Sequence, residues 1–277
     1  MIPTQILLGF LLAAVIGGLA YRRGSLSRSG VAGALITGTV IFGLGGWGWG
    51  VLLVVFFVSS TALSHYREAF KESLSEKFSK GHRRDLAQTF ANGGAGAIIV
   101  LAYYWWPHPL WWAAFAGAMA AVNADTWATE LGVLSRTRPR HILTGQTVEV
   151  GTSGGVTLTG TGAALGGAAL IALVASLFNL LLGQPYPLSL SLSFLFFVSA
   201  TLAGLLGSLY DSFLGATWQA MYFCDQCRKE TERHPLHTCG QPTRLIRGWR
   251  WLDNDWVNFL SSIAGAALAA GLLGFLS

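Results

Sequence analysis

The stretch NADTWATELG, residues 123–132, places two carboxylates, Asp125 and Glu130, inside an apolar segment. That segment spans residues 111–134, close to the ~20 residues that a helix needs to cross a bilayer. Asp125 lies 11 positions (136 − 125) before Arg136, or roughly 16 Å along a helix. A carboxylate at that depth is unfavourable unless a cation, a partner or water compensates, so it marks a candidate functional site. The alternative is a carboxylate that only hydrogen-bonds between helices.

The rest of the 277-residue chain is equally apolar. Charged residues make up 11%, hydrophobic residues 52%, and the mean hydropathy is +0.51. Dividing the long charge-free stretches at their Gly-, Trp- and Pro-rich breaks predicts eight membrane helices. They lie near 3–20, 31–45, 48–65, 88–106, 110–134, 156–182, 189–214 and 254–276. We therefore expect an all-α polytopic integral membrane protein with one membrane domain, 1–277, whose first helix is retained rather than cleaved as a signal peptide.

The positive charges predict the orientation of these helices. All 18 Lys and Arg lie in segments 22–28, 67–84, 136–140 and 228–250, which alternate with uncharged loops. By the positive-inside rule the basic loops are cytoplasmic, so both termini lie outside an inner or plasma membrane. The pI of 9.3 reflects this asymmetry, and with no nucleic-acid module recognisable we expect no nucleic-acid partner.

Tryptophans occur near both expected surfaces of the membrane, where amphipathic rings are favoured. An outer belt is predicted from Trp47, Trp49, Trp105, Trp106, Trp111 and Trp112. An inner belt is predicted from Trp218, Trp249, Trp251 and Trp256.

Strings rich in polar and small residues all lie toward the cytoplasmic side, which indicates one basin rather than a path across the membrane. In RRDLAQTFANGG (83–94), Asp85, Gln88 and Asn92 share one helical face. Arg83 and Arg84 precede them, and arginine forks suit phosphate oxygens. The alternative is a solvated helix end.

The string GTSGGVTLTGTG (151–162) combines glycines with hydroxyls at the expected start of a helix. Exposed N–H groups at Ser153, Gly154 and Gly155 would form an anion site, with Ser153 or Thr157 as the cap. Residues 160–167 contain the GxxxG pair Gly162 and Gly166, which we assign to helix packing.

A third carboxylate, Asp211, lies in GSLYDSFLGATWQ (207–219) among residues of little bulk, including Ser208. Mg²⁺ favours one or two carboxylates plus substrate phosphates, so Asp125 and Asp211 are a plausible Mg²⁺ pair. Glu130 is about 140° around an ideal helix from Asp125, and both reach one ion only if the helix is irregular. Glu130 shares its face instead with Asn123 and Thr126. In WLDNDWVN (251–258), Asp253, Asn254, Asp255 and Asn258 complete the basin or simply cap the last helix.

All three cysteines lie in the cytoplasmic loop 217–251, between the last two helices. The spacing of Cys224, Cys227, His237 and Cys239 is typical of a closed structural Zn²⁺ site, with His234 as a possible substitute for His237. Cytoplasmic cysteines stay reduced, which argues against disulfides. A redox CxxC is less favoured because no thioredoxin-like βαβ pattern surrounds it.

Taken together, ANGG, ADTWATELG, GTSGGV, GSLYDSFLGA, CxxC…TExHxxHxCG and WLDNDWVN resemble the integral membrane family called domain of unknown function 92. That family includes transmembrane protein 19 and the phytyl-phosphate kinases. The resemblance implies phosphoryl transfer from a nucleoside triphosphate, CTP by preference, to a membrane-embedded isoprenyl monophosphate, giving a prenyl diphosphate. The prenyl chain, the nucleotide and the oligomeric state are left open.

The expected kinase site follows from these strings. The catalytic set is Asp125, Asp211, Glu130, Asn92 and Asp255. The substrate-binding set is Arg83, Arg84, Gln88, Asn123, Ser153, Gly154, Gly155, Ser208 and Asn254. Two alternatives remain: a CTP-dependent lipid cytidylyltransferase, which needs the same metal and phosphate groups, and a transporter of prenyl phosphates or small anions.

Overall fold

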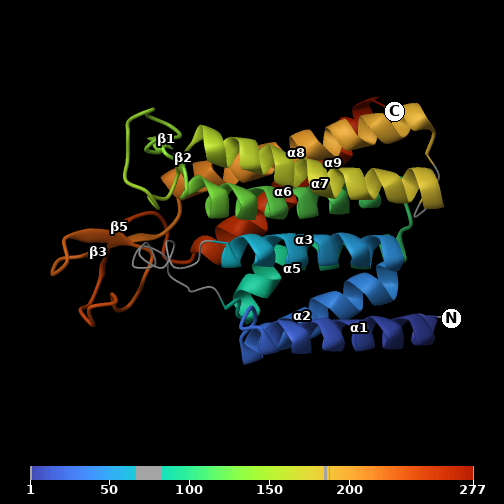
Figure 1. Ribbon diagram of the computed structural model, residues 1–277, viewed down its shortest axis with the longest axis horizontal. Helices are drawn as coiled ribbons and strands as arrows, with labels where there is room; N and C mark the ends of the chain where they lie inside the picture. The colour runs from blue at the N-terminus through green and yellow to red at the C-terminus, as the bar shows by residue number, and fades with distance from the viewer. Residues whose placement is uncertain (1, 67–82, 184–185, 187, 277) are drawn as a thin grey trace.

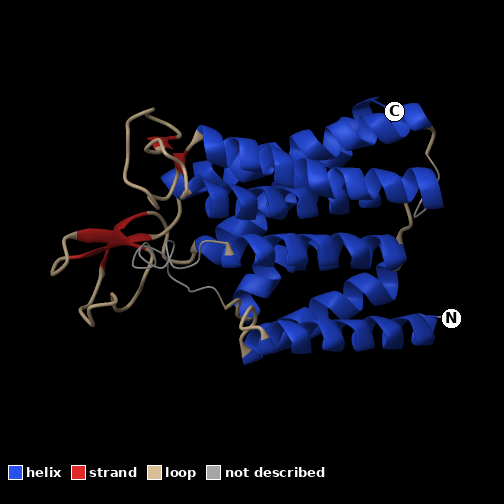
Figure 2. Cartoon of the chain, viewed as in Figure 1, coloured by secondary structure: helices blue, strands red, loops and turns tan. Residues whose placement is uncertain are grey.

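A computed structural model describes residues 2–66, 83–183, 186 and 188–276 as a bundle of long helices with small strands at one end (Figures 1 and 2). Eight helical segments in these residues match the eight predicted spans within a few positions. They are α1 (Ile2–Arg22), α2 (Arg28–Val40) continued by the π-helix η1 (Ile41–Gly45), α3 (Trp47–His65), α5 (Leu86–Trp105), α6 (Pro109–Gly132), α7 (Leu158–Leu182), α8 (Leu190–Thr217) and α9 (Asn254–Leu276). The polytopic all-α prediction is confirmed.

Helix α6 is the centre of the bundle. It packs against α3, α5, α7, α8 and α9, and every residue from Trp112 to Ala124 is buried. The other seven helical segments are apolar and long enough to cross a membrane, but α6 does not meet the same criterion of apolarity. Because protein rather than lipid surrounds α6, it can carry Asn123, Asp125 and Glu130 inside a membrane domain.

Small residues let the neighbouring helices approach α6 closely. A side chain at Gly117 would collide with Gly265 and Ala269 of α9. On α8, a Cβ at Gly207 would lie 2.5 Å from the Cβ of Ala121. Close backbone approach at such positions is how helices associate in the absence of a hydrophobic driving force.

The glycines that pack α7 differ from the predicted GxxxG pair. A Cβ at Gly162 would meet nothing within 4 Å, and one at Gly166 would be in ordinary contact with Trp127. Close approach occurs instead at Gly160, against Gly132, and at Gly167, against the carbonyl of Asn123. The range 160–167 thus packs within the bundle, as assigned, but through Gly160 and Gly167 rather than the GxxxG pair, because Gly162 lies on the outward face of α7.

The tryptophans divide between a core and a surface. Trp47, Trp105 and Trp106 are exposed, as expected of an outer belt. Trp49 and Trp112 are buried instead and pack with Tyr103, Phe115 and Phe196. The belt prediction was wrong for Trp49 and Trp112. At the other end the four predicted inner-belt rings are exposed and form a continuous row: Trp218, Trp249, Trp251 and Trp256.

Short strands gather at the end of the bundle opposite both termini (Figure 1). Strands β1 (Arg140–His141) and β2 (Gly155–Val156) pair antiparallel in the α6–α7 connection. Between α8 and α9, residues 218–253 form what we call the Cys/His subdomain. Its sheet has β3 (Met221–Cys224) between β4 (Lys229–Thr231) and β5 (Arg244–Arg247), all antiparallel.

Two glycine substitutions test this packing. Gly117→Leu should lower the free energy of unfolding by about 1–3 kcal/mol, because the side chain forces α6 away from α9. Gly162→Leu is the matched control and should leave stability unchanged or slightly higher, since the position is open and leucine favours helix. Thermal unfolding in detergent followed by near-UV circular dichroism measures both. Equal destabilisation by the two substitutions would contradict the packing described.

Candidate functional site

Asp125 on α6 and Asp211 on α8 face each other near the strand-bearing end of the bundle. The two carboxylates are near enough for their charges to interact. Ser208 of α8 hydrogen-bonds to Asp125, and the hydroxyl of Ser261 on α9 donates to Asp211 Oδ2 at 3.2 Å. Among the described residues, these contacts of the pair come from hydroxyl groups and not from cationic side chains, so none of them supplies a positive charge.

Glu130 points to another helix. Its Oε1 accepts a 2.7 Å hydrogen bond from Ser64 Oγ of α3, whereas Asp125 faces α8. Helix α6 is regular over this range, so the two carboxylates diverge, in line with the 140° offset. Glu130 therefore lies apart from the Asp125–Asp211 pair.

Asn123 lies on the α3-facing side with Glu130, as predicted, but its amide is used for packing. Its Oδ1 accepts from Ser59 Oγ at 2.9 Å, and its Nδ2 donates to the Gly167 carbonyl at 2.8 Å. The side chain is fully buried. The amide thus joins α3, α6 and α7, and both of its ends are used in these contacts.

Arg84, Gln88 and Asn92 line one pocket between α2, α3 and α5. The pocket has a cavity volume of about 70 Å³, and its walls are mainly apolar. The Arg84 guanidinium donates to Thr61 Oγ1 at 3.3 Å and lies 5.7 Å from the rings of Phe56 and Phe57. Burial lowers the pKa of Arg84 and the charge of Glu130 raises it, but an arginine stays protonated in either case. A fixed positive charge therefore lies at an apolar pocket.

The remaining polar residues of segment 83–94 serve the local structure. Asp85 is the N-cap of α5 and forms a capping box with Gln88, which explains their i, i+3 spacing. Arg83 is exposed, donates to the Leu26 carbonyl at 3.4 Å and lies over the Tyr21 ring. Arg83 is therefore outside the pocket that Arg84 lines.

The turn 151–155 does not begin a helix, because α7 starts at Leu158 with Thr157 as its N-cap. Ser153 is not the cap: its hydroxyl lies 3.1 Å from the Gly215 carbonyl and 2.9 Å from Gln219 Oε1. Gly154, at φ +81°, packs so closely on Ala216 that a Cβ would lie 2.5 Å away. Gly155 belongs to β2. The turn is thus seated against the end of α8, just beyond Asp211.

The start of α9 lies beside the carboxylate pair through Ser261, whose hydroxyl is also bonded to the Asn258 carbonyl. Asp253 accepts from the Trp256 N–H at 3.1 Å, which is the capping role given as the alternative. Asn254 and Asp255 are half-buried in the first turn of α9.

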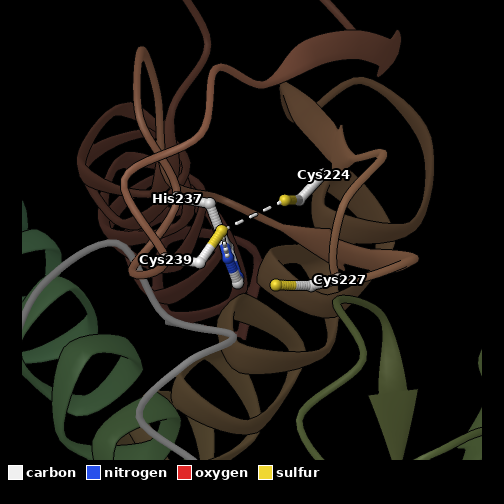
Figure 3. A group of neighbouring side chains, drawn as sticks. All are labelled: Cys224, Cys227, His237 and Cys239. Atoms are coloured by element: carbon white, nitrogen blue, oxygen red, sulfur yellow. Dashed lines mark hydrogen bonds between the residues drawn. The ribbon is translucent and has the colours of Figure 1, made fainter.

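The four predicted metal ligands converge in the Cys/His subdomain (Figure 3). The ligand atoms of Cys224, Cys227, His237 and Cys239 all lie within 4.8 Å of one another. Cys224 Sγ and Cys239 Sγ are 3.6 Å apart, and His237 Nδ1 lies 3.3 Å from Cys239 Sγ. These separations are close to those between ligands around a tetrahedral ion with Zn–S bonds of ~2.3 Å. The group can hold a metal ion.

The pKa of Cys239 and the place of His234 agree with this arrangement. A hydrogen bond from the Gln241 backbone, with help from His237, lowers the pKa of Cys239 to about 6, which favours the thiolate that metals bind. A hydrogen bond involving Cys239 raises the pKa of Cys227 to about 11 in the metal-free group. His234 stacks on Tyr222 with ring centroids 4.4 Å apart, outside the group, so His237 is the histidine of the cluster.

Several residues near these groups were not predicted from the sequence. Gln219 is buried and donates from Nε2 to Glu232 Oε1 at 2.8 Å. Glu232 belongs to the quoted TExHxxHxCG string, and its charge acts on Asp211. Ser64 and Ser261 contact Glu130 and Asp211. The spacing of these residues along the chain does not predict that they contact one another. Glu232 could have been singled out, because it lies in the quoted Cys/His string.

The comparisons with known proteins agree with this architecture. The family model of the integral membrane protein DUF92 matches residues 11–266. Protein PGR of Arabidopsis thaliana is 31% identical over 280 residues, which cover 96% of this chain and 95% of that protein. An uncharacterized membrane protein of Methanocaldococcus jannaschii is 29% identical, over 78% of this chain and 84% of its own. One from Synechocystis is 29% identical, over 89% of this chain and 82% of its own.

No solved structure matches the chain. The family match covers most of the sequence, including the carboxylate pair and the Cys/His subdomain. The chain therefore belongs to the DUF92 family of integral membrane proteins.

Proposed function

We propose that this protein transfers a phosphoryl group from a nucleoside triphosphate, CTP by preference, to a membrane-embedded prenyl monophosphate. The observation that carries the proposal is the Asp125–Asp211 pair, two carboxylates on adjacent membrane helices that hydroxyl groups contact. Two like charges inside a membrane domain are costly unless a cation or a proton neutralises part of the charge. Phosphoryl transfer needs such a cation together with positioning of the phosphates.

The donor set fits Mg²⁺, a hard cation that takes oxygen ligands and keeps coordination positions for substrate phosphates. Asp125 and Asp211 would hold it, with Ser208 and Ser261 fixing the carboxylates through their hydrogen bonds. When bound, Mg²⁺ neutralises charge on the phosphates. The acceptor is already an anionic phosphate, so no general base is needed.

The pocket at Arg84 supports an amphiphilic phosphate as acceptor. A guanidinium binds phosphate oxygens in a fork, and the Asn92 amide adds a hydrogen-bonding group. Leu53, Phe56 and Phe57 offer apolar contacts to the first isoprene units. A lipid with its tail in the bilayer and its head at the strand-bearing end would use both kinds of wall.

One assay tests the reaction and its metal site together. Purified protein in nanodiscs with Mg²⁺, CTP and prenyl monophosphates should yield prenyl diphosphate and CDP, resolved by mass. Asp125→Asn and Asp211→Asn keep the side-chain volume, remove the charge and should each lower turnover by roughly 100-fold. Asp225→Asn is the control, because that carboxylate is exposed and paired with Arg244.

Other products would redirect the proposal. A CDP-lipid with pyrophosphate would identify a cytidylyltransferase at the same site, and nucleotide-independent uptake into proteoliposomes would identify a transporter. Near-normal Mg²⁺-dependent turnover in both Asp→Asn variants would remove these carboxylates from the mechanism.

We also propose that the metal of the Cys/His subdomain is structural zinc, because its cluster offers three thiols and one imidazole with no open position. Purified protein should contain close to one Zn²⁺ per chain. Cys227→Ser should lower both the metal content and the thermal midpoint, whereas His234→Asn, outside the cluster, should retain the metal. Elemental analysis of protein prepared without chelators measures the zinc, and its absence there would remove the idea.

The proposed orientation places the strand-bearing end in the cytoplasm and both termini outside. It rests on the basic loops, which alternate along the chain, and on the position of both termini opposite the strands (Figure 1). In bacterial cells a C-terminal alkaline phosphatase fusion should be active and a C-terminal green fluorescent protein fusion dark. A bright fluorescent fusion with an inactive phosphatase fusion would reverse the orientation.

A further inference from the structure

The Cys/His subdomain reaches back to the carboxylate pair through Glu232, which directly follows β4. Its Oε1 accepts a 2.8 Å hydrogen bond from Gln219 Nε2. Gln219 in turn bonds Ser153, whose hydroxyl lies 3.1 Å from the carbonyl of Gly215, one turn beyond Asp211 on α8. The charge of Glu232 also acts on Asp211. A carboxylate from the metal-binding subdomain is thus held near a carboxylate of the membrane bundle.

The contacts of Gln219 make this placement rigid. The side chain is 2% exposed, and its Oε1 accepts from Ser153 Oγ at 2.9 Å. Both ends of the amide are therefore occupied, one by the turn 151–155 and the other by Glu232. A buried amide with both ends bonded has little freedom to rotate, so it orients the Glu232 carboxylate.

A second contact joins the subdomain to α8 one turn beyond Asp211. Arg247 of β5 donates to the carbonyls of Gly215 and Ala216 at 2.8 and 2.7 Å. These carbonyls belong to the last turn of α8, where cationic donors stabilise the helix end. The end of α8 is thus fixed to the same sheet that carries Glu232.

The Cys/His group brackets Glu232 along the chain. Cys224 and Cys227 precede it and His237 and Cys239 follow it, so a bound ion closes a loop around it. Strand β4 lies within that loop, and β3 ends at Cys224, where the loop begins. Occupancy of the metal group therefore restricts where the Glu232 carboxylate can lie.

We propose that Glu232 is a positioning residue that couples the Cys/His metal group to the Asp125–Asp211 pair. Its negative charge beside Asp211 strengthens cation binding at the pair, and the metal-closed loop keeps that charge in place. The inference rests on the proposed cation site. It makes the subdomain part of the cation-binding apparatus rather than a separate structural unit.

The alternative is that Glu232 serves only the local structure of the subdomain, through contacts such as the Gln219 hydrogen bond. Glu232→Gln separates the two, because a glutamine oxygen still accepts that bond while the charge is gone. Glu230→Gln is the matched control: it makes the same change in charge at an exposed position of β4, where the charge acts on Arg247 and not on Asp211. Glu232→Asp retains the charge and should recover part of the effect.

The experiment measures turnover against Mg²⁺ concentration and, independently, Mn²⁺ binding in nanodiscs by electron paramagnetic resonance. Glu232→Gln should raise the half-saturating concentration of each cation about tenfold, with most of the saturated turnover retained. Cys227→Ser should shift both in the same direction, and Glu230→Gln should shift neither. Zinc content should stay near one per chain in both glutamate variants.

The two readouts separate this inference from the proposed reaction. Absence of prenyl diphosphate with a Mn²⁺ affinity that still depends on Glu232 would reject the reaction and keep the coupling. Unchanged cation dependence in Glu232→Gln would reject the coupling, whatever the product. Wild-type protein that binds no Mn²⁺ through Asp125 and Asp211 would overturn both.

Discussion

A carboxylate cannot lie in contact with lipid hydrocarbon, and the bundle is arranged around this constraint. Asp125 and Glu130 lie on α6, which five helices surround. Alanines and glycines on α6 let those helices approach closely, as where Gly117 of α6 meets Gly265 of α9. Because the apolar helices meet the lipid, the central helix is free to carry polar groups. Burial of α6 thus makes a membrane-embedded polar site possible.

Much of the fold follows from simple patterns in the sequence. Charge-free stretches and their breaks predict eight helices because bilayer thickness sets the helix length. The errors concern which side of a helix faces protein. Trp49 and Trp112 lie near the end of the bundle but turn inward, and Gly162 turns outward. Apolar residues suit both lipid and protein interior, so hydropathy alone does not separate these faces in a membrane protein.

The candidate site was predictable where chemistry restricts residue choice. Cysteine and histidine spacing predicts the metal group, and helical geometry predicts that Glu130 diverges from Asp125. The role of Asn123 could not be predicted in the same way, because an amide side chain serves helix packing and substrate binding equally well. The roles of Gln219 and Glu232 depend on how the subdomain folds back onto α8. That arrangement is a long-range property that no local pattern records.

These contacts link three parts of the chain that lie far apart in sequence. The turn 151–155, the end of α8 and the Cys/His subdomain meet beside Asp211. The Arg84 pocket lies on the α3-facing side of α6, where the charge of Glu130 acts on Arg84.

The most direct test of this account is the position of a bound cation. Crystals grown with Mn²⁺ and a non-hydrolysable CTP analogue, measured at the manganese absorption edge, locate the ion by anomalous scattering. The account predicts a peak between the carboxylates of Asp125 and Asp211 that disappears in Asp211→Asn. A peak at other residues, or one that persists in Asp211→Asn, would contradict it.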